Sequence, residues 1–447
     1  MRFSTEAEPL FDKLVKATEA NRQRAFDFVK ALKPIGGTAI EEALRKALEL
    51  RPSPVTQTRL SEDRADRIVR ATDRPYVVIF LTDGQPTVGV TDEKQILSSV
   101  KRAGGHTRVF CFGIGTDVNT HLLDSITDAT RAFSQYVLPD EDIELKVSSF
   151  FTKIKEPVLA HPALRFGGDI RASRVYPSPL PDLFRGEQLI VVGRYSGDGR
   201  AAVTIEGTVN GVVKKFTDEV EFPARDTEHD FIPRLWATRR IGFLLDEIRL
   251  HGENRELRDE VTDLARRYGI VTPYTAYLIV EDESRRNVPV PMRSLQTFDA
   301  DREGREAMGR AWSGLKDEKS GGPAVYGARG SLALRLAPNA PVALEAGRRE
   351  AAQSVAAAKP APGETTARVV QYAQQQRFVH GRAFFQNGSQ WIDSHVQAMP
   401  NARRVQVKFN SQEYFDLLAR HPHALPWFAV GCNVQLALDN TVYEVTE

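Results

Sequence analysis

The sequence predicts an α/β protein. A doubly wound, mostly parallel sheet comes first, and β-rich and helical segments and a small C-terminal α+β module follow it. Three observations support this prediction. The apolar runs Tyr76–Leu81 and Thr107–Gly115 have the β-branched and aromatic composition of strands that are buried on both faces. Segments with apolar residues at helical spacing separate such runs, as in βαβ units. Beyond residue 157 the pattern changes to alternating runs with Gly and Pro, which favour antiparallel strands.

Composition and charge exclude several classes of protein. The chain has 447 residues, and its 60 Lys and Arg residues nearly balance its 59 Asp and Glu residues, so we expect no nucleic-acid partner. No stretch is apolar over the roughly 18 residues that a bilayer span needs. The start, "MRFSTEAEPLFDKL", lacks the apolar core of a signal peptide, so we expect the chain as given to stay in the cytosol. Cys111 and Cys432 are too few and too far apart for a disulfide framework.

Residues 1–157 form the first predicted domain, in which strands and helices alternate. The helix at residues 21–32 has apolar Ala25, Phe28, Val29 and Leu32 at helical spacing. Thr38 ends the turn "PIGGT" and is expected to cap the helix at residues 39–50. Residues 51–74 are polar and are expected to form a loop with a charged helical segment. The other expected elements are the strands "MRFS", 76–81, 107–115 and "AFSQYVL", and the helices 91–103, 119–129 and 140–154.

The rest of the chain is predicted to form three further segments. Residues 158–283 read as a β-sandwich-like module with a hairpin turn at Asn210-Gly211, then two amphipathic helices and a strand, "YTAYLIVED". Residues 284–370 are rich in Ala, Pro, Gly, Glu and Arg and are expected to be a flexible linker. Residues 371–447 are expected to fold as an α+β module, with hairpins at Asn387-Gly388 and Asp439-Asn440 and a short helix at "SQEYFDLLARHPH".

Two side chains stand out as candidate ligands, Thr38 and Asp83. Both are expected just beyond the carboxyl edge of the parallel sheet, where open α/β sheets bind ligands. A hydroxyl and a carboxylate are hard oxygen donors that suit Mg²⁺ or Mn²⁺. The simpler alternative is that Thr38 only caps a helix and Asp83 only nucleates an Asp-Gly turn.

Three motifs resemble the second half of a von Willebrand factor type A domain. They are "PIGGTAIEEAL", "VIFLTDGQPT" and "FCFGIGTDVNTHLLDSI", and their order and spacing match along roughly residues 1–155. The later motifs "RLWATRRIGFLLDEI", "YGIVTPYTAYLIVEDE" and "GRAFFQNGSQWID" resemble bacterial proteins that join such a domain to a VIT domain. That family includes the inter-alpha-trypsin inhibitor heavy chains, and its full-length members are often exported or membrane-anchored.

The resemblance implies a metal-ion-dependent adhesion site made of five side chains. Thr38 and Asp83 match two of them, whereas the Asp-x-Ser-x-Ser motif that supplies the other three occurs nowhere in this sequence. The chain is therefore expected to begin after the first strand and helix of the family domain and to be N-terminally truncated. Weak or no binding of Mg²⁺ or Mn²⁺ follows, because most of the coordination would be left to water. An exposed sheet edge and uncovered apolar surface are also expected.

The sequence thus favours a protein-interaction module of the adhesion type, with a protein partner and no enzymatic activity. No nucleophile elbow and no phosphate-binding loop is present in the sequence. An alternative is an α/β enzyme that handles nucleotides or phosphate through Asp83. Another is a truncated product without independent function.

Overall fold

The computed structural model describes residues 1–33, 36–52, 76–102, 107–154, 157–209, 212–226, 228–358 and 363–447. The chain divides into two compact units. The first comprises Met1–Ala224 with Lys319–Gly321, and the second comprises Arg225–Glu318 with Gly322–Glu447. The predicted loop at residues 51–74 lies almost wholly outside the described residues, as does the predicted turn at Asn210-Gly211.

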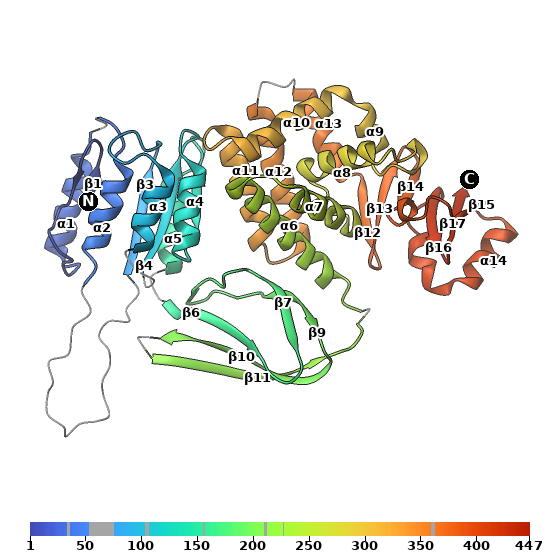
Figure 1. Ribbon diagram of the computed structural model, residues 1–447, viewed down its shortest axis with the longest axis horizontal. Helices are drawn as coiled ribbons and strands as arrows, with labels where there is room; N and C mark the ends of the chain where they lie inside the picture. Colours follow the sequence, from blue (N-terminus) through green and yellow to red (C-terminus); the bar gives the residue numbers. More distant parts are fainter. Residues whose placement is uncertain are drawn as a thin grey trace. The chain divides into compact units, whose positions relative to one another are not determined.

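A three-stranded parallel sheet forms the centre of the first unit and confirms the α/β prediction (Figure 1). Its order is β3 (Tyr76–Thr82), β4 (Thr107–Ile114) and β5 (Ser134–Val137), with Phe80 opposite Cys111 and Cys111 opposite Ser134. β4 is the middle strand and is buried almost throughout, as its apolar run predicts. The helices of this layer are α2 (Ile40–Glu49), α3 (Glu93–Arg102), α4 (Thr120–Ala129) and α5 (Ile143–Ile154).

Aromatic packing and helix capping hold these helices on the sheet. The ring of Phe150 in α5 lies edge-on against Phe110 and Phe112 of β4, with centroids 4.9 and 5.0 Å apart. α4 packs against β4 and begins at Asn119, whose side chain accepts a hydrogen bond from the backbone N–H of Leu122. The predicted boundaries of β4 and α4 therefore agree with the structure within one residue.

The N-terminal part leaves apolar surface uncovered. Within the described ranges β1 (Arg2–Phe3) and β2 (Ala7–Glu8) pair only with each other, and α1 (Glu19–Lys30) has no buried residue. β3 is an edge strand in the part of the chain that is described, and its Ile79 and Leu81 are exposed. The expected exposed sheet edge is therefore present, at β3.

The β-rich part of the first unit contains the predicted antiparallel strands. One sheet has the order β11 (Val212–Phe222), β10 (Gly199–Val209), β6 (Pro157–Phe166) and β8 (Leu183–Phe184). A second sheet consists of β7 (Arg171–Tyr176) and β9 (Val192–Ser196).

A buried ion pair joins this β-rich part to the parallel sheet. The guanidinium of Arg108 on β4 donates to both carboxylate oxygens of Asp182, at 2.7 and 3.1 Å. The backbone N–H of His161 on β6 donates to the same carboxylate at 2.9 Å. Both charged side chains are almost fully buried, so the bidentate geometry and the added backbone donor offset much of the desolvation cost.

The second unit opens with a helical bundle, and one predicted strand there is wrong. "YTAYLIVED" lies in α8 (Pro273–Arg285), because Thr272 and Thr275 form a capping box and Pro273 occupies the first turn. The apolar run reflects a helix buried on several sides. Its companions are α6 (Phe231–His251), α7 (Arg255–Tyr268), α9 (Gln296–Ala300), α10 (Arg302–Asp317), α11 (Gly322–Leu336), α12 (Ala340–Ala358) and α13 (Gly363–Gln374).

The expected flexible linker at residues 284–370 is also wrong for the described residues, which form α9 to α12 and most of α13. Small residues of α12, such as Ala343, Gly347 and Ala351, are buried. They let the helices pack closely although the sequence here has few large apolar side chains. Arg329 on α11 also forms a bidentate pair with the buried Glu350 on α12, at 2.9 and 3.0 Å. Small residues with high helix propensity here support helices, whereas the composition alone suggested a linker.

The C-terminal module confirms both predicted hairpins and the short helix. Its sheet has the order β12-β13-β14-β16-β17-β15. Asn387 pairs with Gln390 across the first predicted turn, and Leu438 pairs with Thr441 across the second. The bounds are β12 (Gln376–Val379), β13 (Arg382–Asn387), β14 (Gln390–Asp393), β15 (Arg403–Lys408), α14 (Gln412–Arg420), α15 (Leu425–Phe428), β16 (Val434–Leu438) and β17 (Thr441–Thr446).

Candidate functional site

Asp83 projects from a turn that Thr82 holds in place. Thr82 is the last residue of β3 and is buried, and its hydroxyl accepts a hydrogen bond from the Gly84 N–H at 3.3 Å and donates to the Gly84 carbonyl at 3.2 Å. The chain therefore reverses at once beyond the sheet, which leaves the Asp83 side chain exposed. Among the described residues Asp83 has no ion pair or side-chain hydrogen bond.

Thr38 lies against the same turn, as the sequence predicts. A Cβ atom placed on Gly84 would meet the Thr38 hydroxyl oxygen at 3.4 Å, which is van der Waals contact. Two hydrogen bonds tie the loop to the segment that follows the turn. The Thr38 N–H donates to the Thr87 hydroxyl at 2.8 Å, and the Thr87 N–H donates to the Thr38 carbonyl at 3.1 Å. The structure thus brings Thr38 to the turn that carries Asp83.

The predicted capping role of Thr38 is wrong. α2 begins at Ile40 with Ala39 at the N-cap position, and no side chain caps this helix end. The backbone N–H of Thr38 instead donates to the Thr87 hydroxyl. Thr38 lies one residue before the N-cap position, so its side chain does not cap the first turn of α2. One part of the simpler alternative, a purely capping Thr38, is therefore excluded.

Two residues near the N-terminus, Ser4 and Thr5, also support this loop and were not found from the sequence. The Thr5 hydroxyl accepts a hydrogen bond from the Gly37 N–H at 3.3 Å, and the backbone carbonyl of Ser4 accepts one from the Ala39 N–H at 2.8 Å. Gly37 has no room for a side chain, because a Cβ there would lie 2.4 Å from a methyl carbon of Val88. Contacts across about 30 to 50 residues leave no spacing signal in one sequence, so sequence reasoning could not find Thr5 or Thr87.

The described residues do not fit a tightly held divalent ion at this edge. Mg²⁺ prefers six oxygen ligands in octahedral geometry, and the Thr38 hydroxyl and the Asp83 carboxylate would supply two of them. No group of three or more His, Cys, Asp or Glu side chains that could hold a metal occurs in the described part of the chain.

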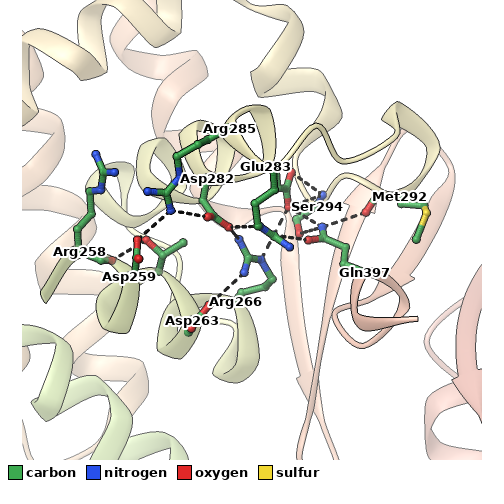
Figure 2. Close-up of polar contacts among 12 residues, drawn as sticks. Arg258, Asp259, Asp263, Arg266, Asp282, Glu283, Arg285, Met292, Ser294 and Gln397 are labelled. Carbon is green, nitrogen blue, oxygen red and sulfur yellow. Dashed lines mark hydrogen bonds and ion pairs between the residues drawn. The ribbon is translucent and has the colours of Figure 1, made fainter. Parts of the chain in front are cut away.

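A second polar cluster lies in the helical unit, around Asp282 of α8 (Figure 2). Its carboxylate accepts hydrogen bonds from Arg266 on α7 at 2.5 Å and from Arg285 at 3.0 Å. Arg286 adds a third at 2.8 Å. Burial acts to raise the pKa of Asp282, but Arg266 and its neighbours outweigh burial and hold the pKa below its usual value. These side chains line a surface pocket of about 420 Å³, in which Arg and Asp residues neutralise one another.

The neighbouring Glu283 connects α8 to the C-terminal module. Its carboxylate is fully buried and accepts the Ser294 N–H at 3.1 Å and the Gln397 side-chain amide at 2.5 Å, as Figure 2 shows. The Gln397 amide also donates to the Met292 carbonyl at 2.9 Å. These contacts join three segments of the second unit, so we interpret the cluster as structural, holding these segments together. The charged run "EDESRR" was its only sequence signal.

Comparisons with known proteins agree with the resemblance. Residues 1–136 match the family model described as von Willebrand factor type A domain. Inter-alpha-trypsin inhibitor heavy chain H4 of Homo sapiens is 26% identical over 309 residues, which are 66% of this chain and 32% of that protein. Heavy chain H3 of Rattus norvegicus is 27% identical over 341 residues, 72% of this chain and 36% of that protein. The chain thus matches only about a third of the length of these relatives.

A solved structure is also similar. It is described as von Willebrand factor type A from Catenulispora acidiphila, with a TM-score of 0.38 and 17% identity, over 62% of this chain and 71% of that chain. The predicted similarity to the type A domain and to the heavy chains is therefore confirmed by the family model and the curated relatives.

We predict that Thr82→Val destabilises the turn after β3, whereas Asp83→Asn does not. Valine keeps the shape of Thr82 but removes the acceptor of the half-buried Gly84 N–H, and the loss of such a hydrogen bond costs about 0.5–1.5 kcal/mol. Hydrogen exchange of residues 82–88 measures the local opening free energy. An equal loss of local opening free energy in Asp83→Asn would contradict an Asp83 side chain without a partner. It would favour the alternative in which Asp83 only nucleates the turn.

We predict that Asp282→Asn lowers the stability of the helical unit in a pH-dependent way. A depressed folded-state pKa adds stability above the unfolded-state pKa of about 3.9, and this stability is lost as the pH falls through the folded-state value. The gap in urea midpoint between wild type and variant should therefore be constant from pH 7 to 5 and shrink below pH 4.

Tryptophan fluorescence reports this unfolding, because Trp236, Trp312, Trp391 and Trp427 all lie in the second unit. Asp263→Asn is the matched control, since the Asp263 side chain is 78% exposed and pairs with the same Arg266 at 3.4 Å. This control should change the midpoint little at any pH. A gap for Asp282→Asn that does not shrink at all between pH 5 and pH 3 would show that its charge is not the cause.

Proposed function

We propose that the chain is a protein-interaction module that contacts its partner through the carboxyl edge of the parallel sheet, and that it is not an enzyme. The observation that carries this proposal is the exposed Asp83, which has no partner among the described residues and lies in the same turn as Gly84, beside which the Thr38 hydroxyl lies. A carboxylate that contributes nothing to the fold at the end of a rigid strand suits recognition.

The chemistry of this edge suits a cationic or hydrogen-bond-donating group on the partner. Asp83 offers a charged acceptor, and Thr38 offers a hydroxyl beside it. In the resembled family a divalent ion would link the domain to a carboxylate of the partner. With two oxygen donors in place, we propose that Mg²⁺ and Mn²⁺ bind weakly and that the contact does not require them.

The similarity to inter-alpha-trypsin inhibitor heavy chains supports a role in protein interactions, although the match covers about a third of those proteins. No helix among the described residues is long and apolar enough to cross a membrane. The sequence contains no phosphate-binding loop of the kind that the phosphate-handling alternative would need beside Asp83.

Site-specific photo-crosslinking tests this proposal. A photoreactive residue at Thr91, on the loop after β3, should capture a protein from an extract of the source cells. The matched control is Lys101, at the far end of helix α3, which begins two residues after Thr91 and is about 15 Å long. Capture at Thr91 should exceed capture at Lys101, fall at least fivefold in Asp83→Lys, and persist in EDTA.

The outcomes that contradict the proposal are distinct. Equal capture at both positions, or no effect of Asp83→Lys, would show that this edge is not the contact surface. Loss of capture in EDTA would show that the contact requires a divalent ion. That result would overturn the proposal that the contact is independent of metal, but not the proposal that this edge is the contact surface.

A further inference from the structure

β11 is a long edge strand with an open side. Its 11 residues pair with β10 from Val209 opposite Val212 to Gly199 opposite Phe222. It is the last strand in its sheet, so its other edge has no strand partner among the described residues (Figure 1). Every side chain of the strand except the last is exposed. Such an edge is a template for pairing with another strand.

The residues on one face of β11 form a self-complementary series. Successive side chains of a strand point to opposite faces, so alternate residues share a face. The series on one face is Val212, Lys214, Phe216, Asp218 and Val220. Read from either end, the series has valine at the ends and phenylalanine in the centre, with a cation on one side and an anion on the other.

Antiparallel pairing of two copies about Phe216 matches every position of this series. Val212 would lie opposite Val220, Lys214 opposite Asp218, and Phe216 opposite its own copy. Residues directly opposite in an antiparallel pair lie on the same face with their Cβ atoms about 5 Å apart. A two-fold axis produces each of these contacts twice, as in any isologous interface.

The side chains in this series are available for such contacts. Val212, Phe216 and Val220 are 49%, 57% and 39% exposed. Lys214 and Asp218 take part in no ion pair in the described part of the chain.

The opposite face of the hairpin differs. There Lys215 lies 3.5 Å from Glu206 of β10, and the hydroxyls of Thr217 and Thr204 are 2.9 Å apart. These polar groups on that face are therefore satisfied within the hairpin. On the series face the Asp218 carboxylate accepts only the Glu219 N–H at 3.0 Å among the described residues, and neither Asp218 nor Lys214 has an ion-pair partner there.

We propose that β11 pairs with β11 of a second copy of this chain and joins the two four-stranded sheets into one. Edge charges usually prevent such pairing, because like charges meet when the strand pairs with itself. Here the register about Phe216 brings opposite charges together on one face. On the other face it places Val213 opposite Glu219 and Lys215 opposite Thr217, so no like charges meet.

This dimer goes beyond the proposed function, because it involves neither Thr38 nor Asp83. Failure of the crosslinking experiment would leave it standing, and the reverse also holds. A dimer would present two copies of the sheet edge that carries Asp83 and so raise the avidity for a partner with repeated binding sites.

Charge exchange in the full chain tests the pairing. Sedimentation velocity at low salt should show wild type in a concentration-dependent monomer–dimer equilibrium. Lys214→Asp and Asp218→Lys each place like charges opposite each other twice, so each should weaken the dimer by about tenfold or more. Both positions are exposed, and circular dichroism checks that both variants remain folded.

Two recombinations separate pairing from a general charge effect. The double variant K214D/D218K should dimerise like wild type, because the opposite charges meet again with their positions exchanged. An equimolar mixture of the two single variants should form a heterodimer, since one copy then carries two anions at these positions and the other copy carries two cations. A wild type that stays monomeric at concentrations up to about 100 μM, or a dimer that none of these changes affects, would overturn the proposal.

Discussion

The candidate site depends on the parallel pairing of β3 with β4. Seven residue pairs, from Tyr76 opposite Thr107 to Thr82 opposite Gly113, fix where β3 ends. That register buries Thr82, whose hydroxyl bonds close the turn and direct Asp83 outward. The loop with Thr38 reaches the same turn through its hydrogen bonds to Thr87. The exposure of Asp83 is thus a consequence of the sheet.

The same sheet explains what is left uncovered. Among the described residues β4 has a strand on each side, whereas β3 has one, and Ile79 and Leu81 of β3 are exposed. The β-rich part is held to this sheet by the buried pair of Arg108 and Asp182, and it ends in the open strand β11. The edges at β3 and β11 both lie in the first unit, while the second unit contains charge clusters such as that of Asp282.

Sequence reasoning succeeded where a local signal is strong and failed where tertiary context decides. The apolar runs of β3 and β4 and the Asn-Gly and Asp-Asn turns were sufficient to place their strands. The run "YTAYLIVED" has strand composition, but the capping box at Thr272 starts a buried helix there. The Ala-rich residues after 284 lack large apolar side chains, yet they pack as helices because small residues permit close contact. Thr38 and Asp83 were found by resemblance, whereas Thr5 and Thr87 act through contacts with residues far away in the sequence, which spacing does not reveal.

The central claim is that Thr38 and Asp83 recognise a partner themselves and hold no resident ion tightly. Electron paramagnetic resonance of Mn²⁺ titrated into the purified chain measures this most directly, because bound Mn²⁺ loses its free-ion signal. The account predicts that wild type and Asp83→Ala leave the free signal equally undiminished at micromolar Mn²⁺. A micromolar binding constant in wild type that Asp83→Ala abolishes would contradict it.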